Sequence, residues 1–185
     1  MGRIYITSDF HFGHNKDFLY GPRGFNSIYD HDNCIIKLWN DVVKEDDLVY
    51  VLGDLMLNDN EYGISCFNQL KGFKKIMIGN HDSTNRVELY PHMRGVIDVK
   101  YADIFKYGQY TFYVSHYPTI TSSHDYYKPL DHRVLNLCGH THTNDKFADW
   151  DKGFIYHCEL DAHNMRPVSI EQIITEIESK NSIGA

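Results

Sequence analysis

The chain has no long hydrophobic run and no excess of positive charge, and each absence excludes a class of protein. No stretch of its 185 residues approaches the roughly 18 apolar residues that span a membrane. The formal net charge of −7 argues against a protein that coats DNA or RNA non-specifically. The basic group Lys71, Lys74 and Lys75 is interpreted as a solvated edge between a helix and a strand. We therefore expect neither a membrane nor a stable nucleic-acid partner.

Cysteine is scarce, and its spacing excludes the common cysteine-based sites. The chain has four cysteines, far apart and never spaced as zinc knuckles or redox pairs. Their apolar neighbours favour buried free thiols in a reducing compartment, which predicts a cytoplasmic location. The first residues lack a secretory hydrophobic region with a cleavage site and are typical of a first strand. No linker, repeat or low-complexity tract interrupts the chain, so we expect one domain over residues 1–185.

The apolar pattern alternates between strands and helices early and is mostly strand-like later. Ser27 and Asp30 mark one helix start, Asn58 and Glu61 suggest another, and Ser169 with Gln172 resembles a capping box before a last helix. Apolar runs predict strands at residues 3–8, 48–52, 75–78, 96–101, 104–107, 110–114, 134–138 and 154–160. This order favours an α/β fold of two packed sheets with helices outside.

Groups of acidic and imidazole residues follow several of these predicted strands. They are Asp9-Phe10-His11, Gly53-Asp54, Gly79-Asn80-His81-Asp82, Ser115-His116 and Gly139-His140-Thr141-His142. In α/β sheets, ligands gather beyond the carboxyl ends of the strands, so the groups are expected to converge. Each pair of ligands two residues apart would project to one side of an extended backbone. The preceding glycines predict sharp turns and a close approach of the backbone to a metal.

These residue types suit divalent metals. Imidazole and carboxylate bind zinc, manganese or iron. One ion would take Asp9, His11 and one imidazole of the last group, and Asp54 would bridge to a second ion through its two carboxylate oxygens. The second ion would take Asn80, His116 and the other imidazole of the last group. The spacing leaves open whether His140 or His142 belongs to the first ion.

The order of these motifs resembles the calcineurin-like metallophosphoesterase superfamily, over residues 9–142. The resemblance implies a four-layer α/β/β/α sandwich of two mixed β-sheets flanked by helices, with a dinuclear centre. It also implies a division of ligands: one ion held by Asp9, His11, Asp54 and His142, the other by Asp54, Asn80, His116 and His140. Asp9-Phe10-His11-Phe12-Gly13-His14 and Arg166-Pro167-Val168 further resemble small bacterial and phage members.

Such a centre predicts a phosphoesterase that uses a hydroxide bridging two metal ions. The ions are expected to be manganese first, with iron, zinc or nickel as alternatives, because His, Asp and Asn ligands suit all four. His81 is the candidate that stabilises or protonates the leaving oxygen, with Asp82 fixing its tautomer. The alternative for Asp82 is a helix N-cap for residues 83–90.

A sequence that is missing after one of the motifs restricts the range of expected substrates. Gly53-Asp54 continues as Leu55-Met56-Leu57, without the Asp-Arg-Gly of the Ser/Thr protein phosphatases, which argues against phosphoproteins. The expected substrates are small, nucleotide-like phosphodiesters, phosphomonoesters or both. Two alternatives remain: a catalytically idle scaffold that binds a protein partner, and a nuclease, which would need a basic track or an added domain.

A few neighbouring residues are candidates for substrate contact. His14 and Arg23 lie in the loop after the first ligand pair, and Arg23 would grip a phosphate unless it is simply solvated. Tyr126 and Tyr127 would stack on a base or sugar, or are incidental aromatics. His163 and Arg166 follow the last predicted strand, where a structural role is favoured over one at the rim of the site.

Overall fold

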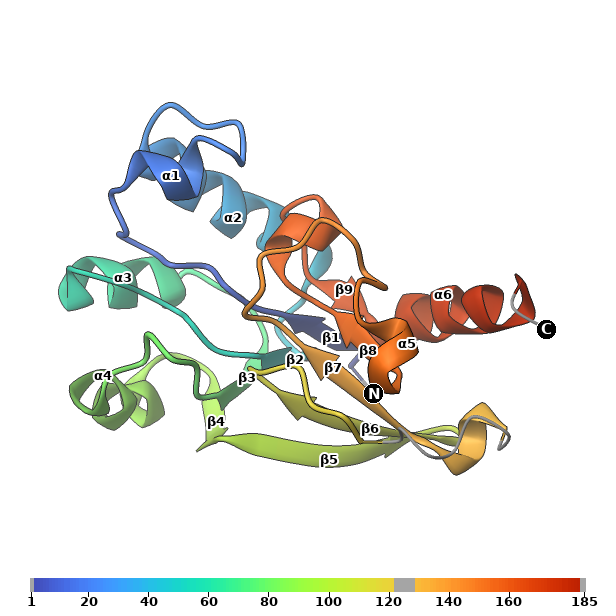
Figure 1. Cartoon of the computed structure of the whole chain (residues 1–185). Helices are drawn as coiled ribbons and strands as arrows, with labels where there is room; N and C mark the ends of the chain where they lie inside the picture. Colours follow the sequence, from blue (N-terminus) through green and yellow to red (C-terminus); the bar gives the residue numbers. More distant parts are fainter. Residues whose placement is uncertain (1, 122–128, 184–185) are drawn as a thin grey trace.

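The computed structural model describes residues 2–121 and 129–183, and these form two mixed β-sheets with helices around them (Figure 1). The first sheet has the order β4-β3-β2-β1-β9, in which only the β1–β9 pair is antiparallel. The second has the order β5-β6-β7-β8, with an antiparallel β5–β6 hairpin and two parallel pairs. The strands are β1 Ile4–Thr7, β2 Leu48–Val51, β3 Phe73–Met77, β4 Val96–Lys100, β5 Ala102–Tyr107, β6 Tyr110–Ser115, β7 Val134–Cys138, β8 Ile155–His157 and β9 Val168–Ser169.

The helices connect these strands, and most are short. Of the two long ones, α2 lies in the connection from β1 to β2, and α6 follows β9 as the last element (Figure 1). The α-helices are α1 Asp17–Tyr20, α2 Ile28–Val42, α3 Asn60–Phe67, α4 Thr84–Leu89, α5 Trp150–Gly153 and α6 Ile170–Ile183. The 3₁₀ turns are η1 Tyr90–His92, η2 Leu130–His132 and η3 Leu160–His163. This is the predicted fold class.

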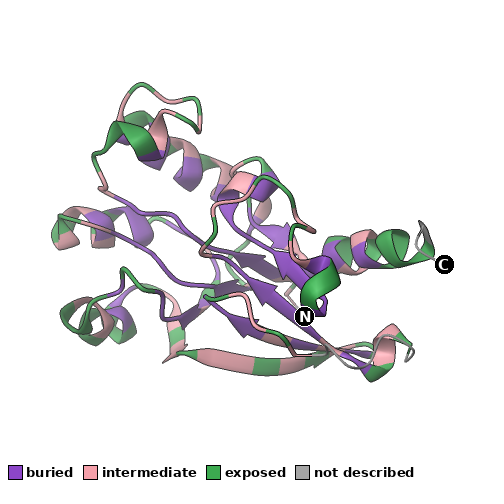
Figure 2. Cartoon of the chain, in the orientation of Figure 1, coloured by how far each residue is buried: buried purple, intermediate pink, exposed green. Residues whose placement is uncertain are grey.

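Two hydrophobic layers hold the sandwich together, because successive strand residues face opposite sides of a sheet. On the outer side of the first sheet, Tyr5, Val49, Val51 and Ile76 pack against α2 and α3, with Trp39 fully buried. On the inner side, residues of the first sheet pack against residues of the second sheet and of α6. This cluster includes Ile6, Tyr50, Leu52 and Met77 from the first sheet and the end of β2, Phe112, Val114, Leu135 and Leu137 from the second sheet, and Ile170, Ile173 and Ile177 from α6. Figure 2 shows these central strands buried, whereas β5 at the edge alternates between intermediate and exposed residues.

The predicted helix starts agree with the structure except at α3. Ser27 caps α2 by accepting from the Asp30 amide, and Ser169 accepts from the Gln172 amide at the start of α6. At α3 the cap is Asp59, whose carboxylate accepts from the Tyr62 amide, rather than Asn58. The strand predicted at 154–160 is also shorter than expected, since Phe154 takes a left-handed conformation and Leu160 begins η3.

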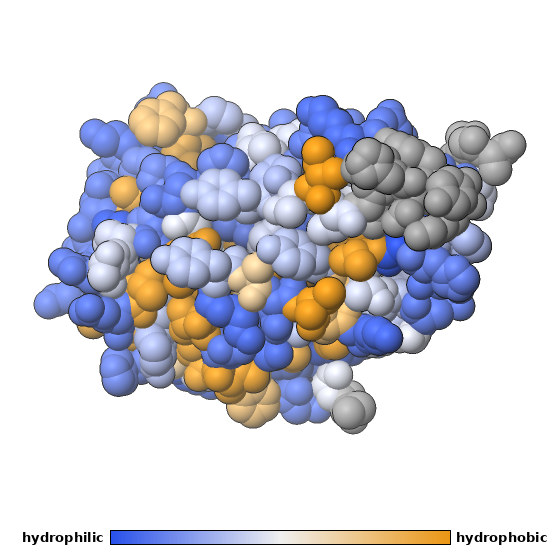
Figure 3. Space-filling model, turned by 60° about the horizontal axis from the view of Figure 1, so that its bottom comes forward, coloured by the Kyte–Doolittle hydropathy of each residue, from blue (hydrophilic) through white to orange (hydrophobic). Residues whose placement is uncertain are grey.

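The face turned forward in Figure 3 belongs to the β4–β5 side of the molecule and mixes hydrophobic with hydrophilic side chains. In β4, β5 and the residue between them, the exposed large hydrophobic residues are Ile97, Tyr101 and Ile104. Within the described part of the chain, no helix combines the length and the apolar character needed to cross a membrane.

Lys74 differs from its interpretation as a solvated residue. Its side chain is fully buried in β3, and its ammonium donates to the backbone carbonyls of Leu70 and Arg94. Burial lowers the pKa of Lys74 to about 8, and the charge of Arg94 acts in the same direction. The unfolded chain therefore binds more protons than the folded chain between pH 8 and the ordinary lysine value of 10.5.

We expect the free energy of unfolding to rise by about 2–3 kcal/mol across this pH window through Lys74 alone. Below pH 8 the ammonium is charged in both states, so the full burial penalty is present. Denaturant unfolding gives the free energy of unfolding of the wild type and of Lys74→Met at pH 7.5 and 10.5. The change with pH in the wild-type minus variant free energy is the contribution of Lys74. Lys75→Met is the matched control, because Lys75 is partly exposed and paired with Asp103. A wild-type minus Lys74→Met difference that stays constant with pH would contradict the assignment.

Candidate metal centre

The predicted acid and imidazole groups meet at the carboxyl ends of five strands, β1, β2, β3, β6 and β7. Backbone hydrogen bonds continue the pairing of the strands into the loops that carry the groups. The amides of Asp9 and His11 donate to the carbonyls of Gly53 and Asp54, and the Gly139 amide donates to the His116 carbonyl. The two sheets thus deliver residues more than 130 positions apart to one place.

One group of ligand atoms comes from the β1 and β7 loops. His11 Nε2 and His142 Nε2 lie 3.1 Å apart, and Asp9 Oδ1 lies 3.8 Å from the first and 3.6 Å from the second. Asp54 Oδ2 is 3.8 Å from His11 Nε2. These atoms face one another closely enough to hold one ion.

A second group lies on the other side of Asp54. Asn80 Oδ1 is 2.8 Å from both His116 Nε2 and His140 Nδ1, and those two nitrogens are 3.2 Å apart. Asp54 Oδ2 lies 3.6 Å from His116 Nε2. One carboxylate therefore adjoins both groups, as the bridging position requires. All seven predicted ligand residues are brought together by the structure.

The donor atoms fit a divalent cation by their chemistry. The buried atom Asp9 Oδ1 has no hydrogen-bond partner, although the other oxygen of the carboxylate accepts from Ser8 Oγ and the His140 amide. His116 Nδ1 faces the Leu52 carbonyl at 2.8 Å, which places the proton there and leaves Nε2 with its lone pair toward Asn80 and Asp54. Lone pairs that converge without a donor between them are the environment of a metal ion.

Electrostatics point the same way. Burial raises the pKa of Asp9, and burial together with the nearby Asp9 carboxylate raises the pKa of Asp54 to about 6. Burial lowers the pKa values of His11 and His140, which keeps these imidazoles neutral. Divalent ions would stabilise the charged forms of the crowded Asp9 and Asp54 carboxylates.

The backbone at these ligands differs from the extended form expected from their spacing. Asp9, His11, Asp54, His140 and His142 all have positive φ, between 51° and 79°. Each ligand pair therefore converges through left-handed turns rather than through the alternation of a strand. Such conformations are uncommon for residues other than glycine and cost about 1 kcal/mol or more each.

Two of the preceding glycines are explained by close contacts. A Cβ at Gly79 would collide with the Asp54 carboxylate, and a Cβ at Gly139 would collide with the Asp9 carboxylate and Ser8. The glycines thus let one ligand loop pack directly against a carboxylate of another loop, whereas the sequence analysis expected an approach of the backbone to a metal.

His81 lies at the open edge of the centre. Its ring is exposed and edge-on to His11, with centroids 5.4 Å apart, and its amide donates to Asp54 Oδ1 at 2.9 Å. The exposed His81 ring is thus free to face a substrate, whereas the His81 backbone amide anchors the Asp54 carboxylate.

Asp82 does not take the predicted position beside the His81 ring. Its Oδ2 accepts from the amides of Gly79 and Asp54, and its Oδ1 accepts from the Leu55 amide and the Tyr90 hydroxyl. Nor is it the helix cap, since Ser83 occupies that position for α4. Asp82 instead joins two ligand loops from beneath, and both hypotheses for it are corrected.

Arg23 is also placed differently from the prediction. The guanidinium is buried and faces Asp161 at 2.7 and 2.9 Å, His31 Nε2 at 2.9 Å and the Asp9 carbonyl at 3.0 Å. A side chain engaged in this way is neither solvated nor available to grip a phosphate. It supports the first ligand group from behind.

Asp161 is a residue that the sequence analysis missed. Its Oδ2 lies 3.1 Å from His142 Nδ1, so it orients the ring whose Nε2 faces His11. Burial acts to raise the pKa of Asp161, but hydrogen bonds with His142 and Arg23 hold it well below its ordinary value. Glu159 similarly holds the last ligand loop through the Thr141 hydroxyl. Asp161 directly follows the strand predicted at residues 154–160, and Glu159 lies two residues earlier, which is the spacing of acidic and imidazole residues that marked the ligands.

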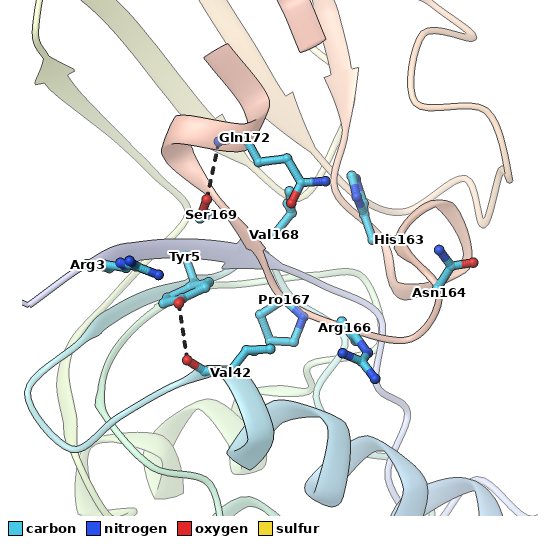
Figure 4. A pocket seen from close by; sticks show the side chains of 10 residues that line it. All are labelled: Arg3, Tyr5, Val42, His163, Asn164, Arg166, Pro167, Val168, Ser169 and Gln172. Carbon is cyan, nitrogen blue, oxygen red and sulfur yellow. Dashed lines mark hydrogen bonds between the residues drawn. The ribbon is translucent and has the colours of Figure 1, made fainter. Parts of the chain in front are cut away.

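The remaining candidates lie elsewhere. His163 and Arg166 line a separate cavity of about 610 Å³ between β1, β9 and the ends of α2 and α6. Figure 4 shows Arg3 and Arg166 at opposite ends of this cavity with Pro167 between them, so their charges do not converge. Tyr126 and Tyr127 lie outside the described residues.

We expect Asp161→Asn to weaken manganese binding about 10- to 100-fold, because an amide cannot hold both the Arg23 guanidinium and the His142 ring as the carboxylate does. Equilibrium titration of chelator-stripped protein with manganese measures this. Asp103→Asn, which removes a surface ion pair with Lys75, is the control. Unchanged affinity in a folded Asp161→Asn protein would show that Asp161 does not support the centre.

Comparison with known proteins gives distant relatives that cover most of the chain. No protein-family model matches it. It is 29% identical to an uncharacterized protein of Methanocaldococcus jannaschii, over 96% of this chain and 93% of the relative. It is 24% identical to the gene 66 protein of Mycobacterium phage L5, over 77% of this chain and 79% of the relative.

One solved structure shares the fold, and two others are more distantly similar. A protein of unknown function from Aquifex aeolicus superposes with a TM-score of 0.71 and 21% identity, over 95% of this chain and 99% of the other. An archaeal phosphodiesterase has a TM-score of 0.48 at 18% identity, covering 87% and 86% of the two chains. A phosphoesterase from E. coli has 0.46 at 13% identity, covering 85% and 78%. The chain therefore shares its fold with the Aquifex aeolicus protein, and the motifs predicted from the sequence meet at the carboxyl ends of strands from both sheets.

Proposed function

We propose that this protein is a metal-dependent phosphoesterase with a dinuclear centre that hydrolyses small, nucleotide-like phosphoesters. The observation that carries the proposal is the pair of ligand groups that adjoin a single carboxylate, Asp54, at 3.6–3.8 Å. One ion would be held by Asp9, His11, Asp54 and His142, and the other by Asp54, Asn80, His116 and His140. Manganese is the first candidate metal. When bound, two such ions activate water and neutralise the charge of a phosphoryl group.

The residues around the ions have their own tasks. Asp161 holds His142, Arg23 holds Asp161, and Asp82 holds the Asp54 and Gly79 loops. The His81 ring stands exposed beside His11, where its imidazole can give a proton to the leaving oxygen of the substrate. His14 lies 5.9 Å from His11, ring to ring, and is retained as a substrate contact.

The net charge of −7 favours compact substrates over long polyanions, because only the ions would make the site locally positive. The negative charge likewise does not favour the nuclease alternative, which would need a basic track. The same site could in principle be idle in a protein-binding scaffold, and the activity measurement below separates that alternative.

Chelator-stripped protein titrated with manganese should regain hydrolysis of bis-p-nitrophenyl phosphate, p-nitrophenyl phosphate or both. Asp54→Asn should lower that activity at least about 100-fold, since the bridge between the two ligand groups is lost. Asp98→Asn, which removes an exposed ion pair with Lys100, is the control. Folded wild-type protein that is inactive with every divalent metal would favour the scaffold instead. The diester-to-monoester ratio narrows the substrate.

His81→Ala should lower kcat by a factor of about 10²–10⁴, as expected for a lost general acid, while the manganese content stays unchanged. The reason is that the His81 ring lies beside the ligand groups without being one of their members. Parallel kinetics and metal analysis of the purified protein provide the test, with His92→Ala as an exposed control on η1. Loss of metal together with activity would make His81 a ligand rather than an acid.

A further inference from the structure

A cavity of about 420 Å³ opens directly onto the candidate metal centre. The residues that line it include the ligand residues His11 and His142 together with His81. A phosphoester whose phosphate lies at the ligand groups would therefore place one of its substituents in this cavity. Because His81 also borders it, that substituent is the one carried by the leaving oxygen.

The outer wall of the cavity is apolar and aromatic. It is formed by the α1 region, with Phe18, Leu19 and Pro22. Phe18 is 72% exposed, although a ring of this size is usually buried. It meets the His14 ring edge to face, with centroids 5.5 Å apart, so it has a defined neighbour at the mouth of the site. The buried Leu19 lies beside it as part of the same wall.

The charge of the cavity excludes a second phosphate. Of the described residues that line it, none is a lysine or an arginine. Arg23 lies nearby, but its guanidinium is engaged by Asp161, His31 and the Asp9 carbonyl. Asp161, itself a lining residue, is an acid. A polyphosphate or bisphosphate would thus meet no free cationic side chain there.

We propose that this cavity is the subsite for the aromatic base of a nucleotide, stacked on Phe18 beside Pro22. A flat heterocycle suits an exposed ring and an apolar wall. Asn144, exposed at the rim, offers an amide that can donate to and accept from the polar edge of a base. This inference rests on the proposed function, since the phosphate is taken to lie at the ligand groups, and it assigns the leaving group to a nucleoside.

Adenosine 5′-monophosphate and ribose 5-phosphate test the subsite, because they share the same phosphate ester and differ only in the base. Their inhibition constants are measured against bis-p-nitrophenyl phosphate with manganese-loaded protein. The nucleotide should bind roughly tenfold more tightly than the sugar phosphate, the gain expected from one stacked base. Phe18→Ala should bring this ratio close to one, whereas Phe18→Trp, which keeps a ring, should preserve it.

Two control variants make the result specific. Tyr101→Ala removes an exposed ring far from the cavity in sequence and should leave the ratio unchanged. Tyr117→Ala removes the half-exposed ring beside His140, at the other ligand group. If Tyr117→Ala abolishes the preference and Phe18→Ala does not, the base binds at that other end and the proposal is overturned. A wild-type ratio near one overturns it as well.

Failure of the subsite and failure of the enzyme are separable. If the manganese-loaded protein shows no hydrolysis, the dissociation constants of the same two compounds are measured by calorimetry. A base preference that depends on Phe18 would then support the subsite although the proposed activity had failed. Hydrolysis without a base preference would retain the phosphoesterase and reject the subsite.

Discussion

The buried carboxylate of Asp82 holds the ligand loops after β2 and β3 in one arrangement. Three backbone amides and the Tyr90 hydroxyl donate to its two oxygens, and two of those amides belong to Asp54 and Gly79 themselves. The loops cannot separate without leaving buried donors unpaired, which costs about 1–3 kcal/mol for each group. Since Asp54 adjoins both ligand groups, the position of every other ligand is defined relative to this anchored pair.

A second support acts from the opposite side through charge. Arg23 and Asp161 are separated by 138 positions in the chain, yet they form a two-point ion pair behind His142. A bidentate pair of this kind fixes direction as well as distance. The open side of the centre is thereby left to His81, His14 and the α1 region, so rigid supports lie behind the ligands and the accessible groups lie in front.

Much of this arrangement could be predicted from the sequence. The order of the strands along the chain and the ligand groups after them follow from local patterns, and so does the need for close backbone packing at Gly79 and Gly139. The structure differs where a residue's partner is distant in the chain. Arg23 was expected to reach outward because nothing near it in sequence indicates Asp161, and Lys74 was expected in solvent because one of its two carbonyl partners, that of Arg94, comes from another segment.

The errors at Asp82 and at the ligand backbone have another origin. The motif places Asp82 beside His81 in sequence, but the chain turns there and directs the carboxylate beneath the loops. Spacing of two residues suggests alternation, but positive φ at Asp9 and His11 produces the same convergence by a different path. A pattern of residue types records which groups meet; it does not specify the dihedral angles by which they meet.

These left-handed ligand positions also restrict how the centre can vary. Asparagine and aspartate tolerate such dihedral angles better than most residues, whereas β-branched side chains are outliers there. At position 54, exchange of Asp for Asn keeps the backbone acceptable, but exchange for valine would disturb the loop as well as remove the ligand. Loss of metal binding could thus arise by two separate routes, and only substitutions compatible with the turn report on the chemistry alone. A substitution that changes the metal preference must therefore introduce one of the few side chains that both bind metal and tolerate a positive φ.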